Sequence, residues 1–159
     1  MKIKLIVVGK LKESYLKEAV SEYMKRLRRF AKVEVIEVAD EKTPDKASLL
    51  ENQQILAKEG KKISGKIGDN DYVIALAIEG KEMSSESLSG YFNTILVSGH
   101  STVTVIIGGS LGLDEEIKKR ADLLLSFGPM TFPHQLMRVM TLEQIYRSFM
   151  IQENSPYHK

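Results

Sequence analysis

Five short apolar segments rich in β-branched residues alternate along this chain with stretches of helical periodicity. Three of the five are apolar almost without interruption, which is typical of strands buried on both faces of a sheet. Strands that alternate with helices predict an α/β fold, in which a parallel sheet is sandwiched by helices. The predicted strands are Ile3–Val8, Val33–Val38, Tyr72–Ile78, Val103–Ile107 and Asp122–Leu125. The predicted helices are Glu13–Arg29, Leu49–Gly65, Ser84–Ser98, Asp114–Arg120 and Pro133–Gln152.

The length of 159 residues, with no repeat or linker, predicts a single domain over residues 1–159. The chain has no cysteine, which excludes disulfides, thiolate zinc sites and cysteine nucleophiles and fits a reducing compartment. No apolar run approaches the roughly 20 residues that span a bilayer. Residues Met1–Gly9 are predicted to form the first strand, not a signal peptide. We therefore expect a cytoplasmic protein without a membrane segment.

Positive charge is concentrated in the first 32 residues, which hold ten Lys or Arg against three acids. This segment has a net charge of +7, whereas the remainder of the chain has −5. A basic face attracts phosphate backbones because each contact releases condensed counterions. A solvated helix face would carry the same charges, so both interpretations remain open.

The final predicted helix has apolar residues around nearly its whole circumference. A helix on the surface of an α/β domain needs only one apolar stripe. One side can pack on the sheet, and the other needs a second cover, which in a chain of this size favours another subunit. We therefore predict a homodimer formed through this helix. The apolar residues are Leu136, Met137, Val139, Met140, Leu142, Ile145, Tyr146, Phe149, Met150 and Ile151.

Three loops follow predicted strands at the edge where a parallel sheet normally binds ligands. These loops are Leu76–Gly80, Gly108–Gly112 and Ser126–His134. The glycines favour either close approach of a ligand or simply a tight turn, and a side chain at Gly108 is expected to fill ligand space without disturbing the fold. The third loop is apolar and aromatic, which suits a flat neutral ligand such as adenine, unless its two Phe residues plug the core. Neither a GxGxxG spacing nor a Walker lysine is present.

Candidate residues for proton transfer lie at the two ends of the final helix. His134 is at its start, one turn before Arg138, beside the candidate pocket. Tyr157 and His158 follow its end, where an aromatic ring can stack on a base and an imidazole can exchange a proton. A frayed terminus is the alternative for this tail. The three histidines have no HxxxH spacing, so we expect no metal site. The sequence also lacks the Gly-x-Ser-x-Gly segment typical of α/β-hydrolases, so we expect no hydrolase triad.

Four segments of the sequence form a recognisable signature, of which the run Thr131–Gln135 is the most specific. Together they resemble the SPOUT superfamily of RNA methyltransferases, in the branch that methylates N3 of a pseudouridine in 23S rRNA. The resemblance covers the whole chain. The segments are Met1–Lys12, Ile106–Gly112, Leu125–Arg138 and Tyr157–Lys159.

The resemblance implies S-adenosylmethionine as methyl donor, no metal, a homodimer and a trefoil knot in the C-terminal part. It implies pseudouridine 1915, in a stem-loop of 23S rRNA on the ribosome, as the target. The cofactor contacts that it implies are Leu76, Gly108, Phe127, Gly128, Pro129, Met130, Thr131 and Phe132. The residues expected to hold the RNA backbone are Lys10, Lys12, Lys25, Arg26, Arg28 and Arg29. The catalytic candidates are His134, Tyr157 and His158 for the proton, which the sequence does not rank, and Arg138 to stabilise the deprotonated uracil or grip a phosphate.

Two other functions remain open at this point. A non-catalytic RNA- or ribosome-binding α/β module would use the basic face alone and would bind no cofactor. A flavodoxin-like nucleotide-binding regulator would need phosphate-binding residues after the first strand, where Gly9–Lys12 offers only one glycine. Calorimetry with S-adenosylmethionine and, separately, ATP distinguishes the three.

Overall fold

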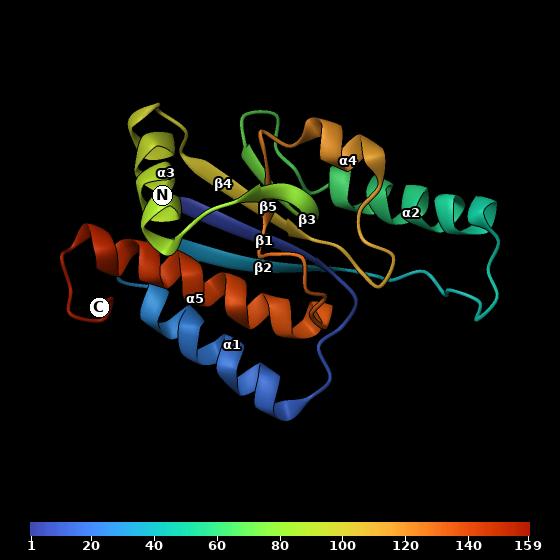
Figure 1. Ribbon diagram of the computed structural model, residues 1–159, viewed down its shortest axis with the longest axis horizontal. Coiled ribbons are helices and arrows are strands. Elements are labelled where there is room, and N and C mark those ends of the chain that lie inside the picture. The colour runs from blue at the N-terminus through green and yellow to red at the C-terminus, as the bar shows by residue number, and fades with distance from the viewer.

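The computed structural model describes residues 1–159, and the predicted alternation of strands and helices is confirmed (Figure 1). The strands are β1 (Lys2–Val8), β2 (Lys32–Val38), β3 (Tyr72–Glu82), β4 (Thr102–Ile107) and β5 (Leu123–Ser126). The helices are α1 (Ser14–Leu27), α2 (Leu49–Ser64), α3 (Ser85–Val97), α4 (Glu115–Arg120) and α5 (His134–Gln152). All strand pairs are parallel, in the order β2-β1-β4-β3-β5.

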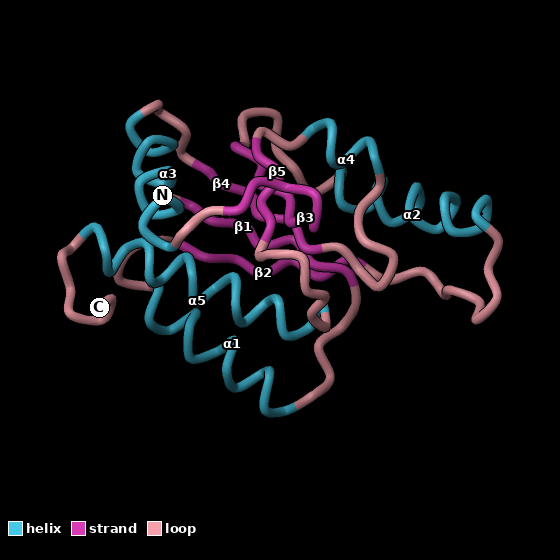
Figure 2. The backbone as a smooth tube through the Cα atoms, in the orientation of Figure 1, coloured by secondary structure: helices cyan, strands magenta, loops and turns pink.

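Helices cover both faces of the sheet (Figure 2). The side chains of successive strand residues belong to two separate cores. Leu5 and Val7 of β1 face α1, α3 and α5, where they join a cluster of 16 buried residues. Ile6 and Val8 face α2 and α4 in a second cluster of nine. Because a strand alternates its side chains between faces, a strand buried on both sides is apolar on both, as Leu5–Val8 of β1 are, whereas Lys2 and Lys4 lie at its amino end.

The third strand extends beyond the predicted end at Ile78 as far as Glu82. Leu76 and Lys81 both pair with Leu125, so the register shifts and the strand continues across β5. A side chain at Gly80 would lie 2.7 Å from the carbonyl oxygen of Leu124, which explains the glycine at this close crossing. The polar segment after Ile78 gave no apolar pattern from which this extension could be predicted.

Helix α5 lies between α1 and α3 and is covered more completely than its sequence suggested (Figure 1). Its inner residues are buried on the sheet, and Phe149 stacks on Phe30 with ring centroids 5.1 Å apart. Of the apolar residues of this helix, Leu136 is the most exposed, at 37%; Val139 and Met140 beside it are half-buried, as are Tyr146 and Ile151 further along. The stretch Leu136–Met140 is called the uncovered stretch of α5 below. None of the helices is both long and apolar enough to cross a bilayer.

Candidate functional site

The carboxyl ends of β3, β4 and β5 open onto one cleft with a volume of about 680 Å³. This volume is typical of a site for a small molecule or cofactor. The walls are largely apolar, and His134 and Met137 of α5 close one side. Of the residues expected to contact a cofactor, all but Pro129 line this cleft. They are Leu76, Gly108, Phe127, Gly128, Met130, Thr131 and Phe132.

Glycines shape the cleft in two different ways. Gly112 and Gly128 have φ of +85° and +105°, and a Cβ at either would meet nothing within 4 Å, so bare backbone is exposed there. Gly108 is different, because a Cβ there would collide with the carbonyl oxygen of Gly112. The expectation that a side chain at Gly108 leaves the fold intact is therefore wrong: the loop itself requires this glycine.

A polar residue that the sequence did not single out ties two of the loops together. The Ser126 hydroxyl donates to the carbonyl oxygen of Ile78 at 3.0 Å and accepts from the backbone N–H of Gly128 at 3.1 Å. Its side chain is buried at the end of β5. Ser126 thus fixes the start of the apolar loop against the middle of β3.

One ion pair lies at the rim of the apolar cleft. The Nζ of Lys118 is 2.6 Å from Oε1 of Glu79, and both residues line the cleft. Acids begin α4 and bases end it, so Lys118 also lies where a positive charge complements the helix dipole. The contact with Glu79 depends on the crossing of β3 over β5, which no local pattern indicates.

His134 is half-buried at the first position of α5 and faces the cleft. Burial lowers the pKa of this imidazole, and the positive charge of Arg138 lowers it further, against the opposing effects of Asp40 and Glu13. The imidazole is therefore mainly neutral at pH 7, the form that can accept a proton.

Arg138 does not face the cleft. Its side chain is only 2% exposed, with Nη1 2.7 Å from Oε2 of Glu37 and Nη2 donating to the carbonyl oxygen of Gly9 at 2.7 Å. The sequence placed Arg138 on substrate, whereas this geometry directs its guanidinium to β2 and the turn after β1. The prediction of a direct contact with the uracil ring gains no support from the geometry.

The C-terminal tail folds back onto α5. The Tyr157 hydroxyl donates to Oε1 of Glu143 at 3.1 Å, and its ring lies 5.1 Å from that of Tyr146. Burial raises the pKa of Tyr157 to about 12, and the Glu143 carboxylate adds to the shift. His158 Nε2 is 2.9 Å from Oε1 of Glu86. The tail therefore has defined contacts, which the alternative of a frayed terminus did not foresee.

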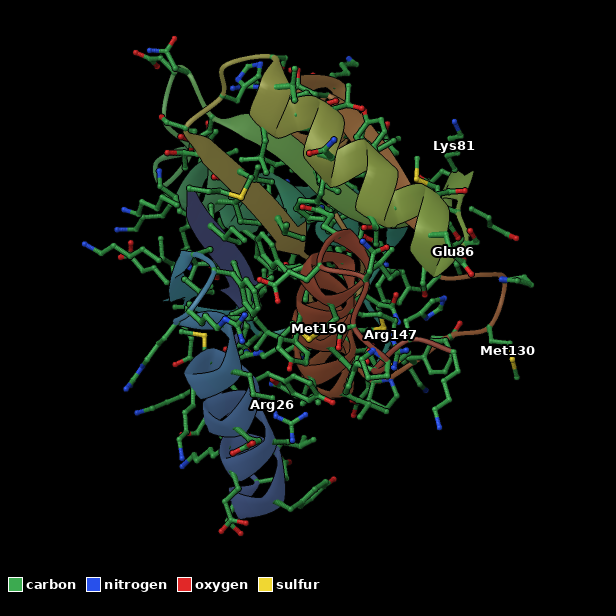
Figure 3. All side chains as sticks on the ribbon, turned by 90° about the vertical axis from the view of Figure 1, so that its left-hand side faces the viewer. Arg26, Lys81, Glu86, Met130, Arg147 and Met150 are labelled. Atoms are coloured by element: carbon green, nitrogen blue, oxygen red, sulfur yellow. The ribbon has the colours of Figure 1, made fainter.

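Arg147 lies at the centre of the contacts that hold the tail on α5. These residues, called the tail cluster below, are Glu143, Tyr146, Arg147, Tyr157 and His158. Arg147 was not among the residues predicted from the sequence. Its guanidinium carbon lies 4.7 Å from the Tyr157 ring centroid, and its Nη2 pairs with Glu143 at 2.7 Å. Seen from the side on which α5 ends, Arg147 lies between Arg26 of α1 and Glu86 of α3 (Figure 3). The i,i+4 spacing of Glu143 and Arg147 was the available signal, but it is common on any solvated helix.

A second hollow of about 500 Å³ lies between the tail cluster and the cleft. Tyr23, Val139, Met140 and Glu143 form part of its lining. Phe127 and Gly128 line both this hollow and the cleft, so the apolar loop separates the two. The uncovered stretch of α5 thus forms the wall of an open, mainly apolar surface.

Within one chain, the catalytic candidates do not come together. Tyr157 packs on Tyr146, which is 12 residues beyond His134 on the same helix. A rise of 1.5 Å per residue separates these two positions by roughly 18 Å. His134 and the tail thus lie at opposite ends of α5.

The basic residues divide between the same two ends. Lys10 and Lys12 are exposed between β1 and α1, where the Lys10 carbonyl accepts from Nε2 of Gln135 near the start of α5. Lys25 and Arg26 lie in the last turn of α1 and Arg28 and Arg29 follow it; Arg29 pairs at 3.0 Å with Glu153, just beyond the end of α5. The structure contains no group of three His, Asp or Glu side chains placed to hold a metal ion.

Comparison with known proteins gives full-length matches. The family described as "Predicted SPOUT methyltransferase" matches residues 1–158. A protein of Leuconostoc citreum named "Ribosomal RNA large subunit methyltransferase H" is 65% identical over 159 residues, covering all of both chains. A protein of the same name from Streptococcus agalactiae is 63% identical over the same span. Among solved structures, a probable methylase family protein from Haemophilus influenzae Rd KW20 has a TM-score of 0.54 at 13% identity, covers 99% of this chain and 70% of that chain, and shares the fold.

Proposed function

The chain belongs to the SPOUT methyltransferase family, and from this premise we propose that it transfers a methyl group from S-adenosylmethionine to large-subunit ribosomal RNA. The proposed acceptor is N3 of pseudouridine 1915 in 23S rRNA. The observation that carries the proposal is the single cleft at the ends of β3, β4 and β5, on which the signature loops converge. An enzyme that modifies ribosomes would act in the cytoplasm.

The chemistry of the cleft fits this cofactor. The apolar loop Phe127–Phe132 offers flat hydrophobic surface to an adenine ring, and bare backbone at Gly112 permits close approach. When bound, S-adenosylmethionine supplies a methyl group activated by its sulfonium centre. The apolar walls of the cleft would exclude water from the bound sulfonium centre. They would also limit the directions from which an acceptor can approach, and such alignment supplies much of the acceleration in a displacement reaction.

The acceptor nitrogen carries a proton that must leave during transfer. His134 lines the cleft and is mainly neutral at pH 7, so its imidazole can accept that proton. The Tyr157 hydroxyl has a pKa of about 12 and is protonated at pH 7, so it donates hydrogen bonds there instead of accepting a proton. We therefore rank His134 first for proton transfer. Tyr157 and His158 are proposed to bind the base.

The separation of His134 from the tail supports a homodimer. If two copies pack their uncovered stretches of α5 antiparallel, around Leu136, Val139 and Met140, the tail of one copy reaches the His134 end of the other. The same packing places the basic end of one α1 beside Lys10 and Lys12 of the other copy. The RNA backbone would then follow a continuous basic surface.

The test is methyl incorporation from labelled S-adenosylmethionine into ribosomes that lack the modification, followed by mapping of the methylated nucleotide by mass spectrometry. We expect one methyl group per 23S rRNA, on N3 of the named pseudouridine. A non-catalytic ribosome-binding module would bind ribosomes but show neither calorimetric binding of S-adenosylmethionine nor transfer. A nucleotide-binding regulator would bind ATP instead. Transfer to another nucleotide would overturn the assignment of the acceptor alone.

A further inference from the structure

A buried arginine one helical turn after His134 has an unusual set of partners. Arg138 is among the largest fully buried side chains of the protein. A buried charge is costly unless it is paired and hydrogen-bonded. Glu37 supplies the opposite charge at 2.7 Å, and the Gly9 carbonyl supplies a second acceptor. The cost of burying Arg138 is thus offset by contacts to the carboxyl ends of β2 and β1.

Glu37 bonds to more than the arginine. The same carboxylate oxygen that pairs with Arg138 accepts the backbone N–H of Leu11 at 2.8 Å. Burial by itself would raise the pKa of Glu37, but these two hydrogen bonds bring it below the usual value. The carboxylate is therefore ionised at pH 7. Its Oε2 atom alone links α5, through Arg138, to the segment before α1, through the backbone N–H of Leu11.

The turn Gly9–Leu11 is held at each of its residues. The Gly9 N–H donates to the carbonyl oxygen of Val38 at 2.8 Å, and Gly9 has φ of +89°, which fixes the reversal. Nε2 of Gln135 donates to the Lys10 carbonyl at 3.3 Å. Together with the bonds from Arg138 and to Glu37, these contacts fasten the turn to β2 and α5. The first three of the five residues that connect β1 with α1 are thus each held by at least one hydrogen bond.

The turn also lies against the proposed proton acceptor. A Cβ on Gly9 would lie 3.9 Å from Nε2 of His134, so the imidazole packs over the bare backbone of the turn. The side chain of Lys10 is exposed on the same turn. We infer that Glu37 is a positioning residue for methyl transfer: by fixing Arg138 and the turn Gly9–Leu11, it holds His134 in place at the cleft and fixes the turn that carries Lys10. This inference rests on the proposed function.

The charges around His134 give the inference a second readout. Arg138 acts on His134 from α5, Asp40 from the segment after β2, and Glu13 from the segment before α1. Glu37 neutralises Arg138, so removal of the Glu37 charge exposes His134 to the full charge of the guanidinium. The pKa of His134 should therefore fall further in such a variant.

The variant that tests this is Glu37→Gln, which keeps an acceptor for the Leu11 N–H but loses the charge that pairs with Arg138. We expect kcat for methyl transfer to fall by about ten- to a hundredfold, as for a displaced catalytic group, with the Kd for S-adenosylmethionine unchanged. The acid limb of the pH–rate profile and the NMR titration of the His134 imidazole should both move to lower pH. His134→Asn identifies the His134 signal among those of the three histidines.

Two further variants separate positioning from general stability. Glu34 lies on the same strand and forms an exposed ion pair with Lys2 at 2.9 Å. The variant Glu34→Gln should therefore leave kcat and the His134 titration unchanged. Glu37→Asp restores the charge and should recover part of the lost kcat. A Glu37→Gln protein with wild-type kcat and an unmoved His134 titration overturns the inference, as does loss of activity only in proportion to the unfolded fraction. If the wild-type protein transfers no methyl group, the proposed function fails, while the His134 titration still decides whether Glu37 controls this imidazole.

Discussion

Each end of the parallel sheet holds an ion pair with a buried member, and the two ion pairs have different surroundings. At the amino end, one oxygen of Asp71 accepts from Lys4 Nζ at 2.8 Å, Thr104 Oγ1 at 2.7 Å and the Gly68 N–H at 2.8 Å. At the carboxyl end, Arg138 binds Glu37 and Gly9, but its Nε is buried without a partner.

The two hydrogen-bond networks differ in their surroundings. The Asp71 network is enclosed by β1, β3 and β4 and satisfies its members, so it contributes to the fold alone. The Arg138 network lies beside the cleft and contacts the backbone against which His134 packs. Incomplete pairing in a buried network is tolerated more readily where it serves a site, and parallel sheets bind ligands at their carboxyl ends.

The largest expected effect is on stability at the amino end. Asp71→Ala removes the acceptor of Lys4, Thr104 and the Gly68 N–H, and should lower the free energy of unfolding by about 3 kcal/mol, as for a broken buried ion pair. Denaturant unfolding measures it. Lys2→Ala, which breaks only the exposed pair with Glu34, should cost less than about 1 kcal/mol. The folded Asp71→Ala protein should keep its affinity for S-adenosylmethionine; a loss of that affinity would show that the two ends are not separate.

The same network predicts a pH dependence. Burial by itself would raise the pKa of Asp71, but hydrogen bonds from Lys4 and Thr104 bring it below the ordinary 3.8. A lowered folded pKa stabilises the protein above the unfolded value and this contribution disappears as pH falls through the folded value. Unfolding free energies measured from pH 6 downward should fall less steeply below about pH 4 in Asp71→Ala than in the wild type. Parallel curves for the two proteins would contradict the assignment.

The next prediction concerns the C-terminal tail that follows α5. Deletion of Tyr157–Lys159 should reduce methyl transfer at least about tenfold, or about 1.4 kcal/mol in transition-state stabilisation, because the residues proposed to bind the base are lost. Affinity for S-adenosylmethionine should be nearly unchanged, since the tail lies outside the cleft. The measurement is single-turnover methylation of ribosomes at saturating cofactor. Wild-type turnover by the deletion variant would show that the tail has only a structural role.

A mixed dimer sharpens this experiment. One subunit lacks the tail, and the other carries a cleft that cannot bind the cofactor. Activity should reappear if the tail of one copy completes the cleft of the other, because one intact composite site is formed. Failure to recover activity, with mixed dimers demonstrated by mass spectrometry, would place the tail in its own subunit's site.

The smallest effects concern the basic residues at the two ends of α5. Lys10→Ala and Lys25→Ala should each weaken ribosome binding and reduce the slope of log K against log salt by about 1, the value for one lost phosphate contact. Lys61→Ala on α2 is the matched control, because Lys61 is exposed on the other face of the sheet. An equal change in the Lys61 variant would mean that binding is governed by net charge and not by a defined surface.

Much of the fold followed from the sequence because buried parallel strands leave an unambiguous apolar pattern. The positions of β1 and β4, and of β3 as far as Ile78, were predictable in this way. The trefoil knot of this family was not: threading leaves no periodicity, and knots are too rare for pattern rules to include them. It entered only through the family resemblance.

The loops of the candidate site were predictable from the sequence, but the hydrogen-bond network of Glu37 and Arg138 was not. The loops at the strand ends were identified because a parallel sheet brings its carboxyl ends together. Glu37 escaped notice because Lys32–Val38 alternates polar and apolar residues, so a charged residue there looked solvated. Arg138 was assigned to substrate because of its spacing from His134, whereas its burial depends on how β1, β2 and α5 pack together.

The most direct test of the account is calorimetric titration of S-adenosylmethionine into three proteins. The wild type should bind one molecule per functional cleft. Phe132→Ala, which removes an aromatic wall of the cleft, should weaken binding by at least about tenfold, as expected for loss of a buried apolar side chain. Tyr72→Phe, which breaks only the contact with Tyr91 at the other end of β3, should bind like the wild type. Equal affinity of Phe132→Ala and wild type, with both proteins folded, would contradict the claim that the carboxyl end of the sheet is the cofactor site.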